Sequence, residues 1–262
     1  MTSTTENVRT VANKSHQESI LYMVHREVVH SPSTVVDHVP GRWSPRTDGV
    51  VGLVVEASSG DSISVNGEPV DGTAEITLGD TVTVGESITV YTTPNDHGSG
   101  DWINIFDYAD TRLADRFEGI DEYPSDESWV VQAQFVPNSG DHVKSSFNRV
   151  RDGDKEFVLP TPGSFHVTIA DREYALEVVP YAGQHYLFFK DATTGTESHP
   201  VGRGLVIFES DLSSVSTLDF NQAKLSPCAL NDILSCPLPP ASNTIAVPVR
   251  AGQRDALFRL ED

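Results

Sequence analysis

Both cysteines of this chain lie in one short block near its C-terminus, and cysteine is the residue here with the widest choice of chemistry. Cys228 and Cys236 are separated by seven residues. They could form a disulfide that closes a short loop. They could supply a thiol activated by a cation such as Arg203, or bind a metal with His185 or His199, the only imidazoles nearby in sequence. The interpretation that we favour is two small buried apolar side chains. Because there is no C-x-x-C motif, we expect no metal site.

Three charged side chains in or before this block are candidate ligand-binding residues. Arg203 has a planar guanidinium that can clamp a carboxylate or a phosphate. It can instead hold two loops together through an ion pair with Asp191 or Asp219. Asp191 follows a predicted strand that ends at Lys190, where a carboxylate can cap the next turn through its own backbone. No catalytic residue is assigned.

The block also contains two asparagines and a run of prolines. Asn221 and Asn243 are candidates too, although short amides bond the backbone at bends more often than they contact a ligand. Pro237, Pro239 and Pro240 fix φ and hold the segment extended. Such stiffness suits a segment that presents polar neighbours at set positions. It equally suits a loop that plugs one end of a barrel.

The common motifs of catalytic and cofactor sites are missing from the sequence. There is no G-x-S-x-G turn, no Walker loop and no H-E-x-x-H motif. The nine histidines are scattered along the chain. We therefore expect neither a cofactor nor a metal cluster, and enzymatic activity stays open.

The chain is strongly acidic. It has 38 acidic and 18 basic residues, which give a net charge of −20. A field of this sign repels phosphate backbones and anionic lipid heads, so we expect neither nucleic acid nor a membrane as a partner. The acids are dispersed, which favours a halophilic protein whose self-repulsion is screened by salt over an acidic surface for a basic partner. No apolar stretch suits a signal peptide or a bilayer span, so we expect a cytoplasmic protein.

One helix is predicted near the N-terminus. Residues 15–30 carry apolar side chains at helical spacing, and Ser31-Pro32 ends the pattern. The apolar residues at this spacing are Ile20, Leu21, Val24 and Val28. Residues 1–14 are polar and are predicted to be a disordered tail.

The rest of the chain is predicted to consist of about a dozen short strands. Asn66-Gly67 lies between two apolar runs and favours a type I′ hairpin turn. The fold class is therefore all-β, mainly an antiparallel sandwich or barrel, with one N-terminal helix. We expect a subdomain over 15–125 with the helix and a β-meander, and a β-rich subdomain over 126–262 that carries the cysteine-containing block.

The segment from Val65 to Gly85 is similar to the closing strands of forkhead-associated domains, which bind phosphothreonine. The resemblance would make Asn66 a ligand to a peptide backbone. The Gly-Arg-Ser and Ser-x-x-His turns, which would carry the groups that meet the phosphate, are missing before it. We favour a β-meander that uses the same turn chemistry for local backbone reasons.

Several motifs in the last third of the chain suggest a family. They are Asp219-Phe220-Asn221, Pro227-Cys228, Cys236-Pro237-Leu238-Pro239-Pro240, Asn243 and Ala251-Gly252, with Gly202-Arg203 upstream. Together they resemble the uncharacterised family catalogued as domain of unknown function 1684, which occurs in archaea and bacteria. The resemblance implies a site in this block but no activity. The chain departs from the pattern at Gln222, where the family has Arg, and at 224–226, where it has an aromatic residue followed by Asn-Pro.

Three functions remain open. The first, which we favour, is a β-rich module that binds a small anionic ligand at a polar recess formed by the C-terminal motif, with Arg203 as the cation. The second is a hydrolase-like enzyme that uses Asp219 or Asp191 as acid–base, with Arg203 and a cysteine. The third is a structural or partner-binding protein. All three depend on whether the block folds back to meet the segment from Asp191 to Arg203, and the oligomeric state is left open.

Overall fold

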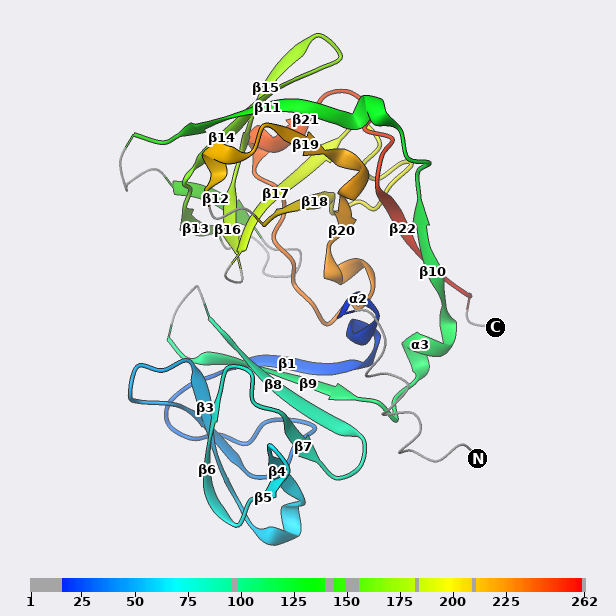
Figure 1. Cartoon of the computed structure of the whole chain (residues 1–262). Coiled ribbons are helices and arrows are strands. Elements are labelled where there is room, and N and C mark those ends of the chain that lie inside the picture. The colour runs from blue at the N-terminus through cyan, green and yellow to red at the C-terminus, as the bar shows by residue number, and fades with distance from the viewer. Residues whose placement is uncertain are drawn as a thin grey trace. The chain divides into compact units, whose positions relative to one another are not determined.

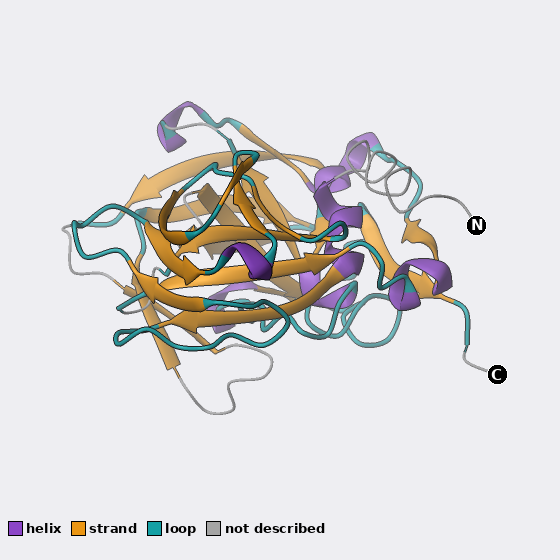
Figure 2. Ribbon diagram, turned by 90° about the horizontal axis from the view of Figure 1, so that it is seen from below, coloured by secondary structure: helices purple, strands orange, loops and turns teal. Residues whose placement is uncertain are grey.

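The chain forms two compact units, Met1–Arg116 and Phe117–Asp262, in a computed structural model. The structure describes residues 16–95, 99–139, 144–148, 156–181, 184–208 and 211–260. Strands dominate and pair almost entirely antiparallel, which confirms the predicted fold class (Figure 2). The predicted tail over 1–14 lies outside the described residues. Within the described part of the chain, no helix is long and apolar enough to cross a bilayer.

The N-terminal unit contains two antiparallel sheets (Figure 1). One has the strand order β1-β9-β8-β7-β4-β5 and the other β2-β3-β6. Their bounds are β1 Met23–Val29, β2 Arg42–Pro45, β3 Gly52–Ala57, β4 Ile63–Val65, β5 Glu68–Pro69, β6 Gly72–Thr77, β7 Val82–Val84, β8 Ile88–Pro94 and β9 Asp101–Asp107. Trp43 is fully buried in the core between these strands, and its indole N–H donates to the carbonyl of Pro40 at 3.0 Å.

The predicted N-terminal helix is present but much shorter than expected. Helix α2 covers His16–Ser19, a 3-10 turn η1 follows over Ile20–Tyr22, and β1 then begins. The second half of the predicted helix is wrong because these residues pair with β9, where Val28 lies opposite Trp102. Valines suit a pleated surface, and pairing with a neighbouring strand outweighs a local helical pattern. Among the described residues of this unit, a second short α-helix, α3, covers Arg112–Arg116.

The predicted Asn-Gly hairpin is confirmed between β4 and β5. Asn66 and Gly67 have φ angles of 52° and 87°, as a type I′ turn requires. The Asn66 side chain donates to the Asp80 carboxylate at 2.7 Å and accepts from the backbone N–H of Thr81 at 3.0 Å. Because the amide is engaged within the unit, the meander interpretation is supported over a peptide-binding role.

The C-terminal unit is built around a four-stranded sheet, β15-β14-β11-β19, and a mostly antiparallel sheet, β16-β17-β18-β20. Strand β21 joins the second sheet parallel to β17, and β10 pairs with β22. The bounds are β10 Phe117–Glu122, β11 Val130–Pro137, β12 Lys144–Asn148, β13 Glu156–Pro160, β14 Gly163–Ile169, β15 Arg172–Glu177, β16 Val179–Tyr181, β17 Gln184–Asp191, β18 Arg203–Ile207, β19 Thr217–Asp219, β20 Lys224–Leu225, β21 Thr244–Ile245 and β22 Gln253–Phe258.

Short 3-10 turns connect these strands. They are η2 Ser59–Asp61 in the first unit, and η3 Glu127–Trp129, η4 Leu212–Ser214, η5 Phe220–Gln222, η6 Pro227–Ala229 and η7 Ala241–Asn243 in the second. The main core cluster of the second unit includes Phe165, Leu187, Phe189 and Phe220, all essentially without exposed surface, and a small second cluster contains Val179 and Phe188. Phe220 belongs to the C-terminal block, so the start of that block is anchored by apolar burial.

Candidate functional site

The C-terminal block lies beside the segment from Asp191 to Arg203, as all three functional hypotheses require. Strand β20 pairs with the start of β18, where Leu225 lies opposite Arg203. Strand β21 pairs with the end of β17, where Ile245 lies opposite Asp191. Backbone pairing therefore brings two stretches far apart in sequence into one region of the C-terminal unit.

Arg203 is only 1% exposed and its guanidinium is engaged by the protein itself. It forms an ion pair with Asp191 and donates to the carbonyls of Val249, Ala251 and Gln253 at 2.6, 2.5 and 3.2 Å. A buried guanidinium is tolerated only when its donors are matched in this way. The ion-pair interpretation is therefore supported, and this burial weighs against Arg203 as a clamp for a ligand.

Asp191 is equally engaged. The oxygen that does not face Arg203 accepts from the backbone N–H and the hydroxyl of Thr193 at 2.6 and 2.5 Å. The Thr193 hydroxyl also lies 2.8 Å from that of Ser198. These bonds cap the turn after β17, as expected for an aspartate that bonds its own following backbone. The pair of Asp191 and Arg203 thus ties this turn to the segment from Val249 to Gln253.

Asn243 is fully buried and joins two strands. Its side-chain oxygen accepts from the N–H of Glu177 at 2.7 Å. Its amide nitrogen donates to the carbonyls of Glu177 and Phe188 at 2.9 and 2.8 Å. Every one of these partners is backbone, so the geometry supports a structural role.

Asp219 and Asn221 form a second small polar set. Asp219 caps η5 by accepting from the backbone N–H and the side-chain amide of Asn221 at 3.0 and 2.9 Å. Asn221 also binds both backbone groups of Asp126, accepting at 3.0 Å and donating at 2.9 Å. The side-chain amide therefore bonds the N–H and the C=O of one residue, as a backbone partner in a β-sheet does, and fixes the start of η3.

The two cysteines lie side by side but are not joined by a disulfide. The backbone N–H of Cys228 donates to the sulfur of Cys236 at 3.2 Å. Cys236 is buried, whereas Cys228 is half-buried and within reach of solvent. Within the described residues, no group of three or more potential ligands is arranged to hold a metal ion.

A histidine that the sequence suggested only as a metal ligand, and a carboxylate that it did not suggest, complete the cysteine site. His199 hydrogen-bonds to the Cys228 sulfur, and its Nδ1 lies 3.1 Å from the carboxylate of Asp255. Its backbone N–H donates to the carbonyl of Arg254 at 2.9 Å. No spacing rule could have found this set, because His199 and Asp255 are 56 residues apart and meet only when β22 returns beside the turn before β18.

The environment changes the ionisation of both groups. The pKa of Cys228 is lowered from 9.0 to about 5, first because the Cys236 thiol donates a hydrogen bond to its sulfur and then because His199 does so and carries a positive charge. The pKa of His199 is raised above 6.5, mainly by its bond to Cys228 and secondly by Asp255, against the opposing effect of burial. The cation near the thiol is therefore His199 and not Arg203.

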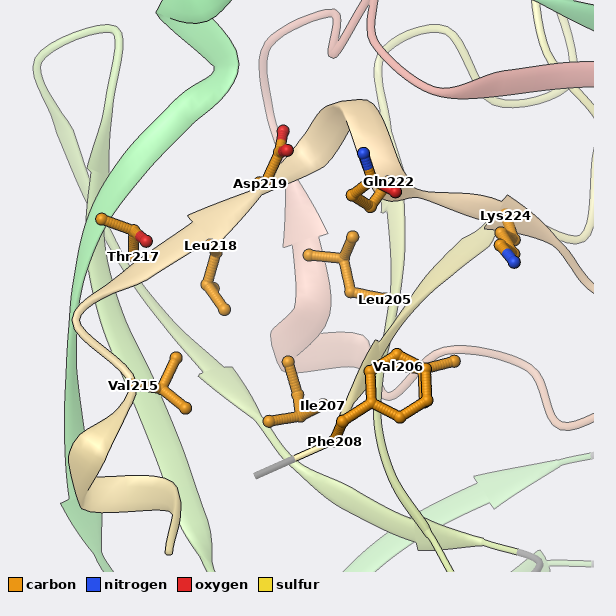
Figure 3. Close-up of a pocket in the computed structure, with 10 residues that line it drawn as sticks. All are labelled: Leu205, Val206, Ile207, Phe208, Val215, Thr217, Leu218, Asp219, Gln222 and Lys224. Carbon is orange, nitrogen blue, oxygen red and sulfur yellow. The ribbon is translucent and has the colours of Figure 1, made fainter. Parts of the chain in front are cut away.

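A groove of about 240 Å³ opens beside the same motif (Figure 3). Its apolar wall comes from β18 and the segment before β19, and polar side chains come from the motif itself. The lining residues are Leu205, Val206, Ile207, Phe208, Val215, Thr217, Leu218, Asp219, Gln222 and Lys224. Of the seven residues predicted for the site, only Asp219 lines this groove.

The predicted site residues thus form three bonded pairs and one separate amide. Asp191 pairs with Arg203, Asp219 with Asn221, and Cys228 with Cys236, while Asn243 bonds mainly backbone groups and accepts one longer bond from the Ser242 hydroxyl at 3.4 Å. In all of these sets except the cysteine pair, the polar side-chain groups are engaged in internal hydrogen bonds. The cysteine pair is different because one thiol is partly exposed and has a shifted pKa.

Comparison with known proteins gives a family but no activity. No curated protein matches the chain. A solution NMR structure of an uncharacterized protein from Haloarcula marismortui is 26% identical, covers 53% of this chain and 77% of that chain, and has a TM-score of 0.41. The model for "Protein of unknown function (DUF1684)" matches residues 115–254, more than half of the chain and nearly all of the C-terminal unit. The chain therefore belongs to the DUF1684 family of proteins of unknown function.

Proposed function

We propose that the C-terminal unit is a binding module for a small amphipathic ligand with an anionic group, held in the groove of Figure 3. This keeps the C-terminal motif as the site and replaces Arg203 by Lys224 as the cation. The observation that carries the proposal is an apolar hollow with an unengaged ammonium group at its rim.

The apolar part of the groove suits a hydrocarbon body. The buried side chains of Leu205, Ile207 and Leu218 face the space between two segments of the chain (Figure 3). Phe208, which is 80% exposed, offers an aromatic face at the edge. A cavity of about 240 Å³ is small for a ligand site, which limits the ligand to a short body.

Lys224 supplies the charge. Its side chain is exposed and, among the described residues, makes no ion pair or hydrogen bond. The chain has far more acids than bases, so such a cation beside an apolar hollow is a local exception. Asp219 also lines the groove with the opposite charge, and its carboxylate accepts hydrogen bonds from the backbone and side chain of Asn221.

The proposal can be tested with hexanoate and its neutral counterpart, hexanol. NMR titration of the isotope-labelled protein with hexanoate should shift the signals of Leu205, Ile207 and Leu218. Lys224→Gln should weaken hexanoate binding about tenfold, or ~1.4 kcal/mol, and leave hexanol binding unchanged. Lys190→Gln is the matched control, because Lys190 lies on β17 and does not line the groove.

Two results would contradict the proposal. One is an equal loss of hexanoate affinity in the Lys224→Gln and Lys190→Gln variants, which would indicate a general charge effect. The other is a titration in which the groove signals do not move. The enzyme alternative based on Asp191 or Asp219 has less support, because both carboxylates are occupied by internal hydrogen bonds.

A further inference from the structure

The two cysteine sulfurs are held by each other's backbones. The N–H of Cys228 donates to the sulfur of Cys236 at 3.2 Å, and the N–H of Cys236 in turn donates to the sulfur of Cys228. The turn η6 and the following loop create this arrangement by reversing the chain between the two residues. Two sulfurs in such a setting need only small movements to bond to each other.

Asp255, His199 and Cys228 form a chain of hydrogen-bonded side chains that ends at the Cys228 sulfur. His199 bonds to the Cys228 sulfur through its ring, and Asp255 accepts at its Nδ1 at 3.1 Å. The carboxylate therefore orients the ring and stabilises its protonated form. A thiol, an imidazole and a carboxylate in this order are the parts that activate a cysteine nucleophile.

We propose that Cys228 is a peroxide-reactive cysteine, with Cys236 as its resolving partner, His199 as its proton donor and Asp255 as a positioning residue. This is a redox site independent of ligand binding in the groove, since none of its four residues lines that groove.

The chemistry balances with a hydroperoxide as the oxidant. The Cys228 thiolate attacks the distal oxygen, a sulfur–oxygen bond forms, and the oxygen–oxygen bond breaks. His199 gives its proton to the departing oxygen, so that water or an alcohol leaves. Cys228 becomes a sulfenic acid and has lost two electrons, while the peroxide has gained them.

Cys236 then completes the reaction. Its thiol attacks the sulfenic sulfur, the disulfide forms, and the oxygen leaves as water with the thiol proton. Exposure assigns the two roles. Cys228 is half-buried and can be reached by a small oxidant, whereas Cys236 is buried beside it. A hydroperoxide is small enough to react without a deep substrate cleft.

The lowered pKa of Cys228 supports this assignment. A thiolate is the reactive form, and with a pKa of about 5 it predominates at neutral pH. The ionisable groups around its sulfur are Cys236 and His199, and Asp255 acts through His199. Loss of His199 removes a donor and a positive charge, so thiolate formation should move to higher pH.

The first experiment measures iodoacetamide alkylation of the native protein at pH 6 by mass spectrometry. Cys228 should react at least on the order of tenfold faster than it does in His199→Gln. Asp255→Asn should give a smaller loss. His166→Gln is the matched control, because His166 is exposed on β14 and bonds neither cysteine. Circular dichroism verifies that each variant is folded.

The second experiment adds hydrogen peroxide to the reduced full-length protein. The wild type should lose the mass of two hydrogen atoms as the disulfide forms. Cys236→Ser should instead gain one oxygen atom and be trapped by dimedone at Cys228. Cys228→Ser, which is close in size to the native residue, should do neither at the same peroxide concentration.

Some results would overturn the proposal. They are equal alkylation rates in the wild type and His199→Gln, oxidation of Cys236 in the Cys228→Ser variant at the wild-type rate, or a folded wild type that forms no disulfide with peroxide. Each is read without the groove ligand, so failure here leaves the binding proposal unaffected.

Discussion

Two polar clusters of the C-terminal unit tie its last residues to the turn between β17 and β18, yet they differ in how far their hydrogen-bonding capacity is used. Arg203 and Asp191 are buried and engaged by backbone and by each other. Cys228 and His199 are half-buried and hydrogen-bonded to each other, and the pKa of each side chain is shifted. A saturated cluster stabilises the fold, whereas one with an exposed, shifted group has capacity left for chemistry.

The largest effect should come from breaking the saturated cluster. Arg203→Met leaves the Asp191 carboxylate buried without its counter-ion and three carbonyls without a donor. We expect a loss of about 3–5 kcal/mol in the free energy of unfolding, measured by urea denaturation.

A double variant and a surface variant sharpen this test. Arg203→Met with Asp191→Leu should recover much of the loss, because no unpaired charge remains buried. Arg250→Met removes an exposed ion pair with Glu197 and should leave the urea midpoint unchanged. Equal destabilisation by Arg203→Met and Arg250→Met would end the distinction between buried and exposed pairs.

Asn243→Ala should give the next largest effect. The change leaves two backbone carbonyls and one N–H in the interior without their partner, at a cost of about 2–3 kcal/mol. Asn221→Ala is the matched control, since Asn221 is only half-buried and should cost roughly 1 kcal/mol. If the control costs more than the Asn243 change, burial does not determine the role of these amides.

Gly252→Ala tests the backbone beside Arg203. Gly252 has a φ of 71°, and a Cβ there would lie 2.5 Å from the carbonyl oxygen of Ala223. The substitution should cost more than about 1 kcal/mol, read from the thermal unfolding midpoint. Gly60 has no positive φ, and a Cβ there would meet only the Ser58 hydroxyl at an ordinary contact distance of 3.7 Å, so Gly60→Ala should be nearly neutral. A neutral Gly252→Ala would indicate that this segment is less tightly fitted than its contacts suggest.

The ionisation of Cys228 and His199 should make the free energy of unfolding depend on pH. The pKa of Cys228 is lowered from 9.0 to about 5 in the folded state, so its contribution is complete above about pH 9 and is lost progressively as the pH falls to about 5. The pKa of His199 is raised, so its contribution is complete below about 6.5 and is lost as the pH rises through the folded value.

Measurement of urea unfolding from pH 4 to 9 tests both signs. The wild type should lose stability relative to Cys228→Ser as the pH falls from about 9 to about 5, with little further change below that. Its advantage over His199→Gln should shrink at high pH, above the folded pKa of His199. Parallel curves for the wild type and both variants would contradict the ion pair between these side chains.

The smallest expected effect is a difference in salt response between the wild type and the Arg203→Met variant. With a net charge of −20, unfolding in molar KCl should be less favourable than at low salt, as the halophilic prediction requires. The wild type and Arg203→Met should respond equally, because the buried pair is little screened. Stability that does not change with KCl would contradict the halophilic prediction. A different salt response in the variant would contradict a buried, unscreened pair.

Part of the site could be predicted and part could not. The ion pair of Arg203 with Asp191 and the proximity of the cysteines were each among the alternatives drawn from residue types. The pairing of His199 with Asp255 was outside every pattern, and His199 was considered only as a metal ligand, because the two residues meet through the return of β22 along the turn that holds His199. Contacts between residues so distant in sequence leave no local signal.

The sequence by itself determined the β architecture, the Asn66-Gly67 turn, the net negative charge and the block that contains both cysteines. Its alternating apolar residues and turn chemistry act locally, so they can be read along the chain. The tertiary structure decided the end of the first helix, since pairing with β9 converted its second half into β1. It also decided which polar side chains are engaged in internal hydrogen bonds, because burial and hydrogen bonding depend on neighbours that only the folded chain supplies.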